Sequence, residues 1–195
     1  MLEPCLPKKT AKNVEDALDK RVPPTTPSQY FKPQTITDTM TITPLLTPDN
    51  YGKNMLPLIQ SAKKTLYIQT QYIHLAKKQS PSDLITLLTA VRDKMEAGVD
   101  VRIILSEWEN PPSLDALKSF GINTSLVKLQ NGVHNKGFVI DSSIVALGSQ
   151  NWSVQGAQQN RDASLIIQHE GVAQYYEQIF MHDWTKMAVQ HLKLG

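Results

Sequence analysis

The sequence predicts an α/β domain in which helices cover a sheet. From residue 47 onward, segments with apolar residues at helical spacing alternate with short runs of strand-forming residues. Helices that alternate with strands are typical of a layered α/β domain. Before this pattern begins, prolines are frequent, and nine of the twelve lie ahead of residue 60. We therefore expect a helix-and-sheet body preceded by an extended arm.

The proline-rich part defines the domain organisation that we predict. Residues 21–39 alternate proline with polar residues, and proline there excludes a helix because it lacks the backbone donor and clashes with the preceding turn. We expect an N-terminal arm or linker over residues 1–45 and a folded α/β body over residues 46–195. Few apolar residues in the arm predict that it is removable or open to proteolysis.

The elements of the body follow in order. The segment 80–98 has a serine cap, a proline near its first turn and a glycine at its end, which predict a helix. Helices are expected at 47–64, 80–98, 112–121 and 171–192. Strands are expected at 65–73, 99–107, 124–130, 134–141, 143–151 and 162–168.

Composition excludes several classes of protein. The chain has 195 residues and a net charge of +2, so its charge alone does not indicate a nucleic-acid or anionic-membrane partner. Cys5 is the only cysteine, which excludes an internal disulfide and a zinc site with several thiolates. There is no apolar run of 18 residues and no signal-peptide pattern, so we expect a soluble chain without a transmembrane segment. The compartment is not indicated.

One hairpin carries the polar residues that matter most for function. Asp141 begins a turn between two apolar runs, so the flanking segments are expected to pair. Strand side chains alternate, which places His134 and Lys136 on one face, and Ser149 and Asn151 together at the end of the second strand. A lysine, a hydroxyl and an amide suit the oxygens of a phosphate, and the histidine is left to attack or to transfer a proton.

The spacing of these residues resembles the signature of the phospholipase D superfamily. The pattern HxKx4D begins at His134, and GSxN begins at Gly148, whose small size would allow close backbone approach. Asp162 follows where family members carry the carboxylate that holds the nucleophilic histidine, although many relatives have glutamate. The strand at 65–73 is similar to the Gln-Tyr strand of two-motif members, and the resemblance extends over residues 45–187.

The resemblance implies a mixed central sheet flanked by helices on both faces. It also implies metal-independent phosphodiester hydrolysis, or phosphatidyl transfer, through a covalent phosphohistidine on His134. Lys136, Ser149 and Asn151 would bind the phosphoryl oxygens, and Asp162 would fix the histidine tautomer. Neither a metal nor another cofactor is expected, because lysine supplies the positive charge. Asp141 is expected to hold the turn.

The family builds its site from two such motifs, and this chain has one. His74 follows a strand but lacks the lysine spacing, so it has little support as the second histidine. We expect either a homodimer that brings two copies of His134 together or a missing N-terminal half that carries the other motif. The chain is most similar to the second half of a two-motif protein.

The substrate is the least determined part of the prediction. Trp108 is expected on the loop rim between two glutamates that are interpreted as solvated charges, and Gln71 is expected either to line the site or to pack in the core. Scattered lysines and an acidic rim favour phospholipid, and therefore lipid degradation, over nucleic acid. A nuclease of the same superfamily is the alternative, and a non-catalytic half-module is a third possibility. A metal site built from His134, Asp141 and Asp162 is disfavoured by the lysine among them.

Overall fold

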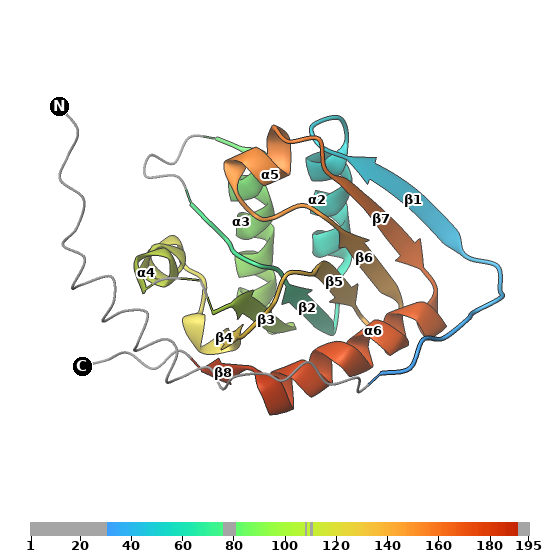
Figure 1. The fold of residues 1–195 in the computed structure, drawn as a ribbon. Helices are drawn as coiled ribbons and strands as arrows, with labels where there is room; N and C mark the ends of the chain where they lie inside the picture. Colours follow the sequence, from blue (N-terminus) through green and yellow to red (C-terminus); the bar gives the residue numbers. More distant parts are fainter. Residues whose placement is uncertain (1–30, 76–80, 108, 110, 191–195) are drawn as a thin grey trace.

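A computed structural model describes residues 31–75, 81–107, 109 and 111–190 (Figure 1). The described chain forms one eight-stranded sheet in the order β1-β7-β6-β5-β2-β3-β4-β8. The strands are β1 (Thr41–Leu46), β2 (Thr65–Gln69), β3 (Asp100–Ser106), β4 (Val127–Gln130), β5 (Lys136–Ile140), β6 (Ile144–Gly148), β7 (Ala163–Gln168) and β8 (Val189–Gln190). Strands β2, β3 and β4 are parallel and all other pairs are antiparallel, so the sheet is mixed, as predicted.

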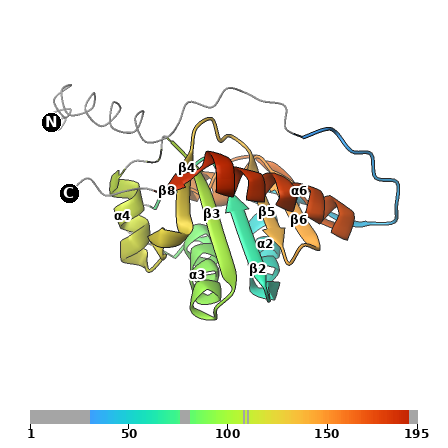
Figure 2. The ribbon, with the colours of Figure 1, turned by 90° about the horizontal axis from the view of Figure 1, so that it is seen from below.

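Helices cover both faces of this sheet, which confirms the predicted fold class. The helices are α2 (Tyr51–Ser61), α3 (Asp83–Glu96), α4 (Pro111–Phe120), α5 (Val154–Gln158) and α6 (Glu170–His182). Figure 2 shows α2 and α3 on one face and α6 on the other. Short 3-10 and π-helical segments lie at η1 (Thr124–Leu126) and η2 (Asp183–Met187). In the described part of the chain, no helix is long and apolar enough to cross a membrane.

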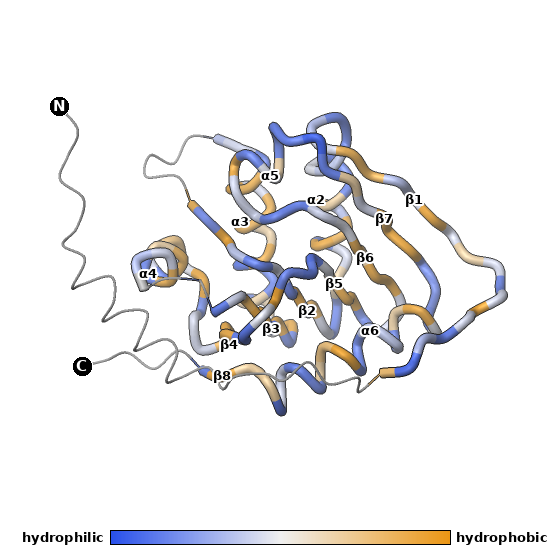
Figure 3. The backbone as a smooth tube through the Cα atoms, viewed as in Figure 1, coloured by the Kyte–Doolittle hydropathy of each residue, from blue (hydrophilic) through white to orange (hydrophobic). Residues whose placement is uncertain are grey.

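Two apolar clusters hold the layers together. The larger one packs α2 and α3 against the sheet, and Ile68, Ile103 and Phe138 belong to it. The smaller one packs α6 against the opposite face, around Tyr67 and Phe180, whose rings stack with centroids 4.9 Å apart. Figure 3 shows hydrophobic residues distributed along both the strands and the helices. Burial of this apolar surface on both faces is the main force that stabilises the sheet.

Three elements differ from the sequence prediction. Residues 41–46, of which 41–45 were placed in the arm, form the edge strand β1 and pair with β7. Pro44 argues against a strand in the sequence, because proline cannot donate to a neighbouring strand. An edge strand tolerates such a residue on its unpaired side. The last helix ends at His182 and continues as η2 before β8, and the short helix α5 was not predicted. The predicted boundary at residue 45 therefore falls inside a strand of the sheet, and residues 1–30 of the arm lie outside the described chain.

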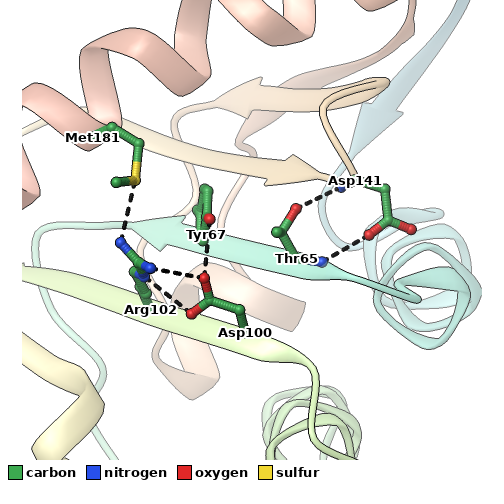
Figure 4. A network of polar contacts seen from close by, with 6 residues as sticks. All are labelled: Thr65, Tyr67, Asp100, Arg102, Asp141 and Met181. Atoms are coloured by element: carbon green, nitrogen blue, oxygen red, sulfur yellow. Dashed lines mark hydrogen bonds and ion pairs between the residues drawn. The ribbon is translucent and has the colours of Figure 1, made fainter.

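A charged cluster ties the two parallel strands to the end of α6 (Figure 4). The Asp100 carboxylate accepts hydrogen bonds from the Arg102 guanidinium at 2.8 and 3.0 Å and from the Tyr67 hydroxyl at 3.1 Å. Burial and the nearby Asp100 charge raise the pKa of Tyr67 to about 12. Arg102 also lies over the rings of Tyr67 and Trp184, at 5.4 and 5.6 Å. These contacts fix β2 and β3 against the polypeptide that follows α6.

Asp141 anchors the β5–β6 turn to the start of β2. Its carboxylate accepts hydrogen bonds of 2.8 Å from the backbone N–H groups of Lys63, Lys64 and Thr65 (Figure 4 draws the contacts with Thr65). Burial opposes ionisation, but the three N–H donors and the Lys64 charge hold the pKa of Asp141 below its usual range. The residue has φ of 50°, which Asp and Asn tolerate better than most residues.

Replacing Asp141 with alanine should lower the free energy of unfolding by about 2 kcal/mol, because backbone donors lose a charged acceptor. Asp141→Asn keeps one acceptor and the tolerance for positive φ, so it should cost less. The depressed pKa means that ionised Asp141 contributes fully above about pH 5 and loses its contribution as the pH falls through the folded-state value. Urea unfolding at pH 7 and pH 3 tests this. An Ala variant as stable as wild type at pH 7 would contradict it.

Candidate functional site

The ends of four neighbouring strands meet at one edge of the sheet. Strand β5 runs antiparallel to β2 and β6, so its N-terminal end lies beside the C-terminal ends of those two strands. The C-terminal end of β3 lies at the same edge, because β2 and β3 are parallel. The HxK and GSxN segments are therefore brought together by strand direction. Strand ends of this kind are common positions for ligand sites in α/β proteins.

His134 and Lys136 lie next to each other at this edge. His134 is exposed and belongs to the connection before β5, two residues earlier than the first residue of the strand. Lys136 is 8% exposed; its Nζ donates a hydrogen bond to the His134 carbonyl and lies 3.3 Å from His134 Nδ1. Burial lowers the pKa of Lys136, while the Asp162 charge opposes this shift. The lysine thus places a cation beside the imidazole, and His134 Nε2 is the ring nitrogen away from this contact.

Ser149 and Asp162 form a second pair. The Ser149 hydroxyl donates to Asp162 Oδ1 at 2.7 Å, and it accepts from the Ala163 N–H at 3.2 Å. Backbone pairing between Ser149 and Ala163 at 3.0 Å holds the two segments together. In the described part of the chain, the carboxylate of Asp162 makes its hydrogen bond with Ser149, whereas the sequence predicts His134 as its partner. Its effect on Lys136 shows that this carboxylate acts electrostatically on the same site.

Asn151 is held by Gln71, one of the residues that the sequence proposes as site lining. Asn151 Nδ2 donates to Gln71 Oε1 at 3.3 Å. Asn151 Oδ1 is buried and has no hydrogen-bond partner among the described residues. The next residue, Trp152, is fully buried and donates from Nε1 to the Tyr51 hydroxyl at 3.1 Å. This packing fixes the end of the GSxN segment, and Gln71 determines how the Asn151 amide is turned.

The remaining predicted residues have other positions. Asp141 lies at the opposite end of β5 from Lys136, where it holds the turn. Gly148 is required by packing, since a Cβ there would overlap the Ser164 side chain on β7. Trp108 lies outside the described residues. Among the residues that are described, no group of three or more His, Cys, Asp and Glu is placed to hold a metal ion.

Two features of the edge were not anticipated. Glu109, interpreted as a solvated loop charge, is completely buried and lies 3.2 Å from the imidazole of His74. The buried Gln69 accepts a hydrogen bond from Asn135 at 2.8 Å and donates to Asp183 at 3.0 Å. All three contacts join residues that are distant in sequence, so no local sequence pattern could predict them.

Comparison with known proteins places this arrangement in a family. Residues 55–184 match the family described as the PLD-like domain of cardiolipin synthase. The chain belongs to the phospholipase D superfamily. It is 30% identical over 134 residues to a cardiolipin synthase of Clostridium perfringens, and this match covers 65% of the chain and 26% of that protein. It is 32% identical over 92 residues to a mitochondrial cardiolipin hydrolase of Xenopus tropicalis, covering 46% of the chain and 44% of that protein.

Solved structures of the superfamily share the fold. The phospholipase D family member Nuc of Salmonella typhimurium superposes with a TM-score of 0.64 at 17% identity, over 80% of this chain and 100% of Nuc. At this identity the likeness shows the fold. The curated cardiolipin synthase is much longer than the matched region, and this phospholipase D-like chain spans about a quarter of its length.

Gln71→Leu should weaken binding of inorganic phosphate about tenfold, because the Asn151 amide loses the acceptor that orients it. Leucine has a similar volume, so thermal unfolding should change little. The matched control is Gln155→Leu, at an exposed position on α5. Titration calorimetry measures both variants. Equal phosphate affinity in the two variants would show that Gln71 does not orient the site.

Proposed function

We propose that this chain carries out metal-independent cleavage or transfer of phosphodiesters through a covalent phosphohistidine on His134. The observation that supports the proposal most strongly is the pairing of a buried lysine with an exposed histidine at one sheet edge. Lys136 Nζ lies 3.3 Å from His134 Nδ1, and His134 Nε2 is the ring nitrogen away from this contact; attack on phosphorus requires the tautomer in which Nε2 carries no proton. Ser149 and Asn151 come to the same edge from β6.

In the first step, His134 Nε2 forms a bond to phosphorus while the bond from phosphorus to the leaving oxygen breaks. The leaving alcohol takes a proton from a second histidine. In the second step, water or an alcohol attacks phosphorus, gives its proton to that second histidine, and His134 departs. The single chain supplies the nucleophile and its phosphate-binding groups for this sequence.

Lys136, Ser149 and Asn151 are proposed to stabilise the charge on the phosphoryl oxygens. The low exposure of Lys136 strengthens its attraction for an anion, because water screens the charge less. Asp162 is proposed to orient His134 and to support its positive charge when the ring is phosphorylated. The hydrogen bond that Asp162 accepts from Ser149 fixes its carboxylate at the end of β6, where its charge also acts on Lys136.

The substrate class that we propose is phospholipid. The support is the family match and the relatives, which are named cardiolipin synthase and mitochondrial cardiolipin hydrolase. A nuclease of the same superfamily would use the same groups on a nucleic-acid backbone. Cardiolipin vesicles, phosphatidylcholine vesicles and plasmid DNA, offered separately, distinguish the two. Cleavage of DNA without cleavage of either lipid would overturn the lipid assignment.

We also propose that the second histidine comes from another polypeptide segment. One imidazole cannot occupy both ends of an in-line displacement, and the chain carries one HxKx4D motif. The matched region covers 26% of the cardiolipin synthase to which the chain is similar. Either two copies of this chain face each other across one phosphate, or a further segment carries the second motif. In a two-fold dimer, two copies of Lys136 and Asn151 would surround the substrate.

His134→Ala should abolish turnover and leave the midpoint of thermal unfolding unchanged, because the side chain is exposed and contributes little packing. Asp162→Asn should retain part of the rate, since that residue orients and does not attack. Both are measured with bis-p-nitrophenyl phosphate in excess EDTA, where wild type should remain active. Activity that disappears with the chelator and returns with magnesium would reject the phosphohistidine mechanism.

Mixing wild-type and His134→Ala chains tests the shared site. If each site needs His134 from two chains, the activity of mixtures that exchange subunits should be proportional to the square of the wild-type fraction. If each chain works alone, the activity should be proportional to the wild-type fraction itself. Sedimentation velocity on the same samples reports the oligomeric state. A fully active monomer would contradict both the dimer and the missing-half proposals.

A further inference from the structure

A buried glutamine connects the segment that carries His134 to the end of α6. Gln69 is the last residue of β2 and is 6% exposed. Its Oε1 accepts a hydrogen bond of 2.8 Å from Asn135 Nδ2, and its Nε2 donates one of 3.0 Å to Asp183 Oδ2. Asn135 lies between His134 and Lys136, and Asp183 directly follows α6. The proposed phosphate chemistry gives no role to this Asn135–Gln69–Asp183 chain.

The chain of contacts lies on the face of the sheet opposite Lys136. Val139 packs under α6, whereas Phe138 packs under α2 and α3. Since strand side chains alternate, Asn135 shares the α6 face and Lys136 lies on the other face. There the Lys136 ammonium donates to the His134 carbonyl. The backbone around His134 is therefore held from both faces of the sheet, by the lysine on one and by the asparagine on the other.

Asp183 fixes the direction of both hydrogen bonds. An ionised carboxylate only accepts, so Gln69 turns its NH2 group toward Asp183 and its carbonyl oxygen toward Asn135. Gln130 Oε1, which lies 3.5 Å from Gln69 Nε2, is a second acceptor for the same NH2 group. Hydrogen bonds in a chain that ends at a charge strengthen one another. A carboxylate at the end of α6 thus determines how the amide of the exposed Asn135 is held.

We propose that Asn135, Gln69 and Asp183 are positioning residues that hold the His134 backbone in the geometry required for attack on phosphorus. This inference rests on the proposed function and adds three residues that act through His134. Displacement of a reacting atom by about 1 Å can lower a rate about 100-fold. The groups proposed to bind the phosphoryl oxygens lie outside this chain of contacts. Its loss should therefore lower kcat and leave KM nearly unchanged.

Two substitutions that remove the same hydrogen bond test the role. Asn135→Ala removes the donor at an exposed position, where the fold does not depend on the side chain, and Gln69→Met removes both hydrogen bonds at similar volume. With bis-p-nitrophenyl phosphate, each should lower kcat about tenfold and change KM less than about twofold. The double variant should be as slow as Gln69→Met alone, because the two effects share one contact. Wild-type kcat in either single variant, a loss that lies in KM, or two effects that multiply would overturn the proposal.

Gln190→Met is the matched control. Gln190 Nε2 donates to the carbonyls of Thr124 and Val127 at 3.0 Å, so this substitution also removes two glutamine hydrogen bonds, but on the edge strand β8. It should keep the wild-type kcat, and a loss as large as that of Gln69→Met would overturn the assignment to position. Asp183→Ala takes the charged acceptor from Gln69 and should also lower kcat. Wild-type kcat in Asp183→Ala would overturn the role of that carboxylate.

Backbone dynamics separate this inference from the proposed function. The amide order parameters of residues 134 and 135, measured by NMR relaxation, should be about 0.85 in wild type and in Gln190→Met, and below about 0.6 in Asn135→Ala and Gln69→Met. Such a decrease supports the chain of contacts as the structure that orders the His134 backbone, even if wild type shows no turnover and the proposed function fails. Order parameters that stay at the wild-type value overturn the positioning role, and turnover that depends on His134 would leave the proposed function intact.

Discussion

The antiparallel pairing of β5 with both of its neighbours is the constraint on which the site depends. Gln69 faces Gly137 on one side, and Lys136 faces Gly148 on the other. This register puts the start of β5 beside the ends of β2 and β6. Since strand side chains alternate, a slip of one residue would move Lys136 to the opposite face of the sheet. The turn held by Asp141 and the apolar layers on both faces specify the register.

The polar groups at this edge are held by neighbours that are themselves fixed. Lys136 is buried against the strands while its ammonium remains beside His134, and Trp152 packs in the core directly after Asn151. Such an arrangement orients the polar groups before a ligand arrives, which reduces the cost of ordering them on binding. Glu109 is buried in the same way, and its carboxylate lies 3.2 Å from the imidazole of His74, which also stacks on Tyr72.

Local patterns predicted most of the elements. Ser82 caps α3 as its sequence indicates, and Gly121 adopts φ of 102° at the end of α4. The strand Thr41–Leu46 was missed, because Pro44 is compatible with a strand only at an edge. The last helix was drawn too long, because its apolar spacing continues through the π-helical turn at Asp183–Met187.

The sequence by itself determined the family, the α/β class and the set of polar residues that meet at one edge. These follow from the spacing of residues within short segments, because the periods of strands and helices determine which residues share a face. Only the tertiary structure decided that Asp162 bonds with Ser149, that Gln71 holds Asn151, and that Glu109 is buried against His74. Each of these contacts joins segments that local spacing does not relate, and each depends on which strands become neighbours and on what covers them.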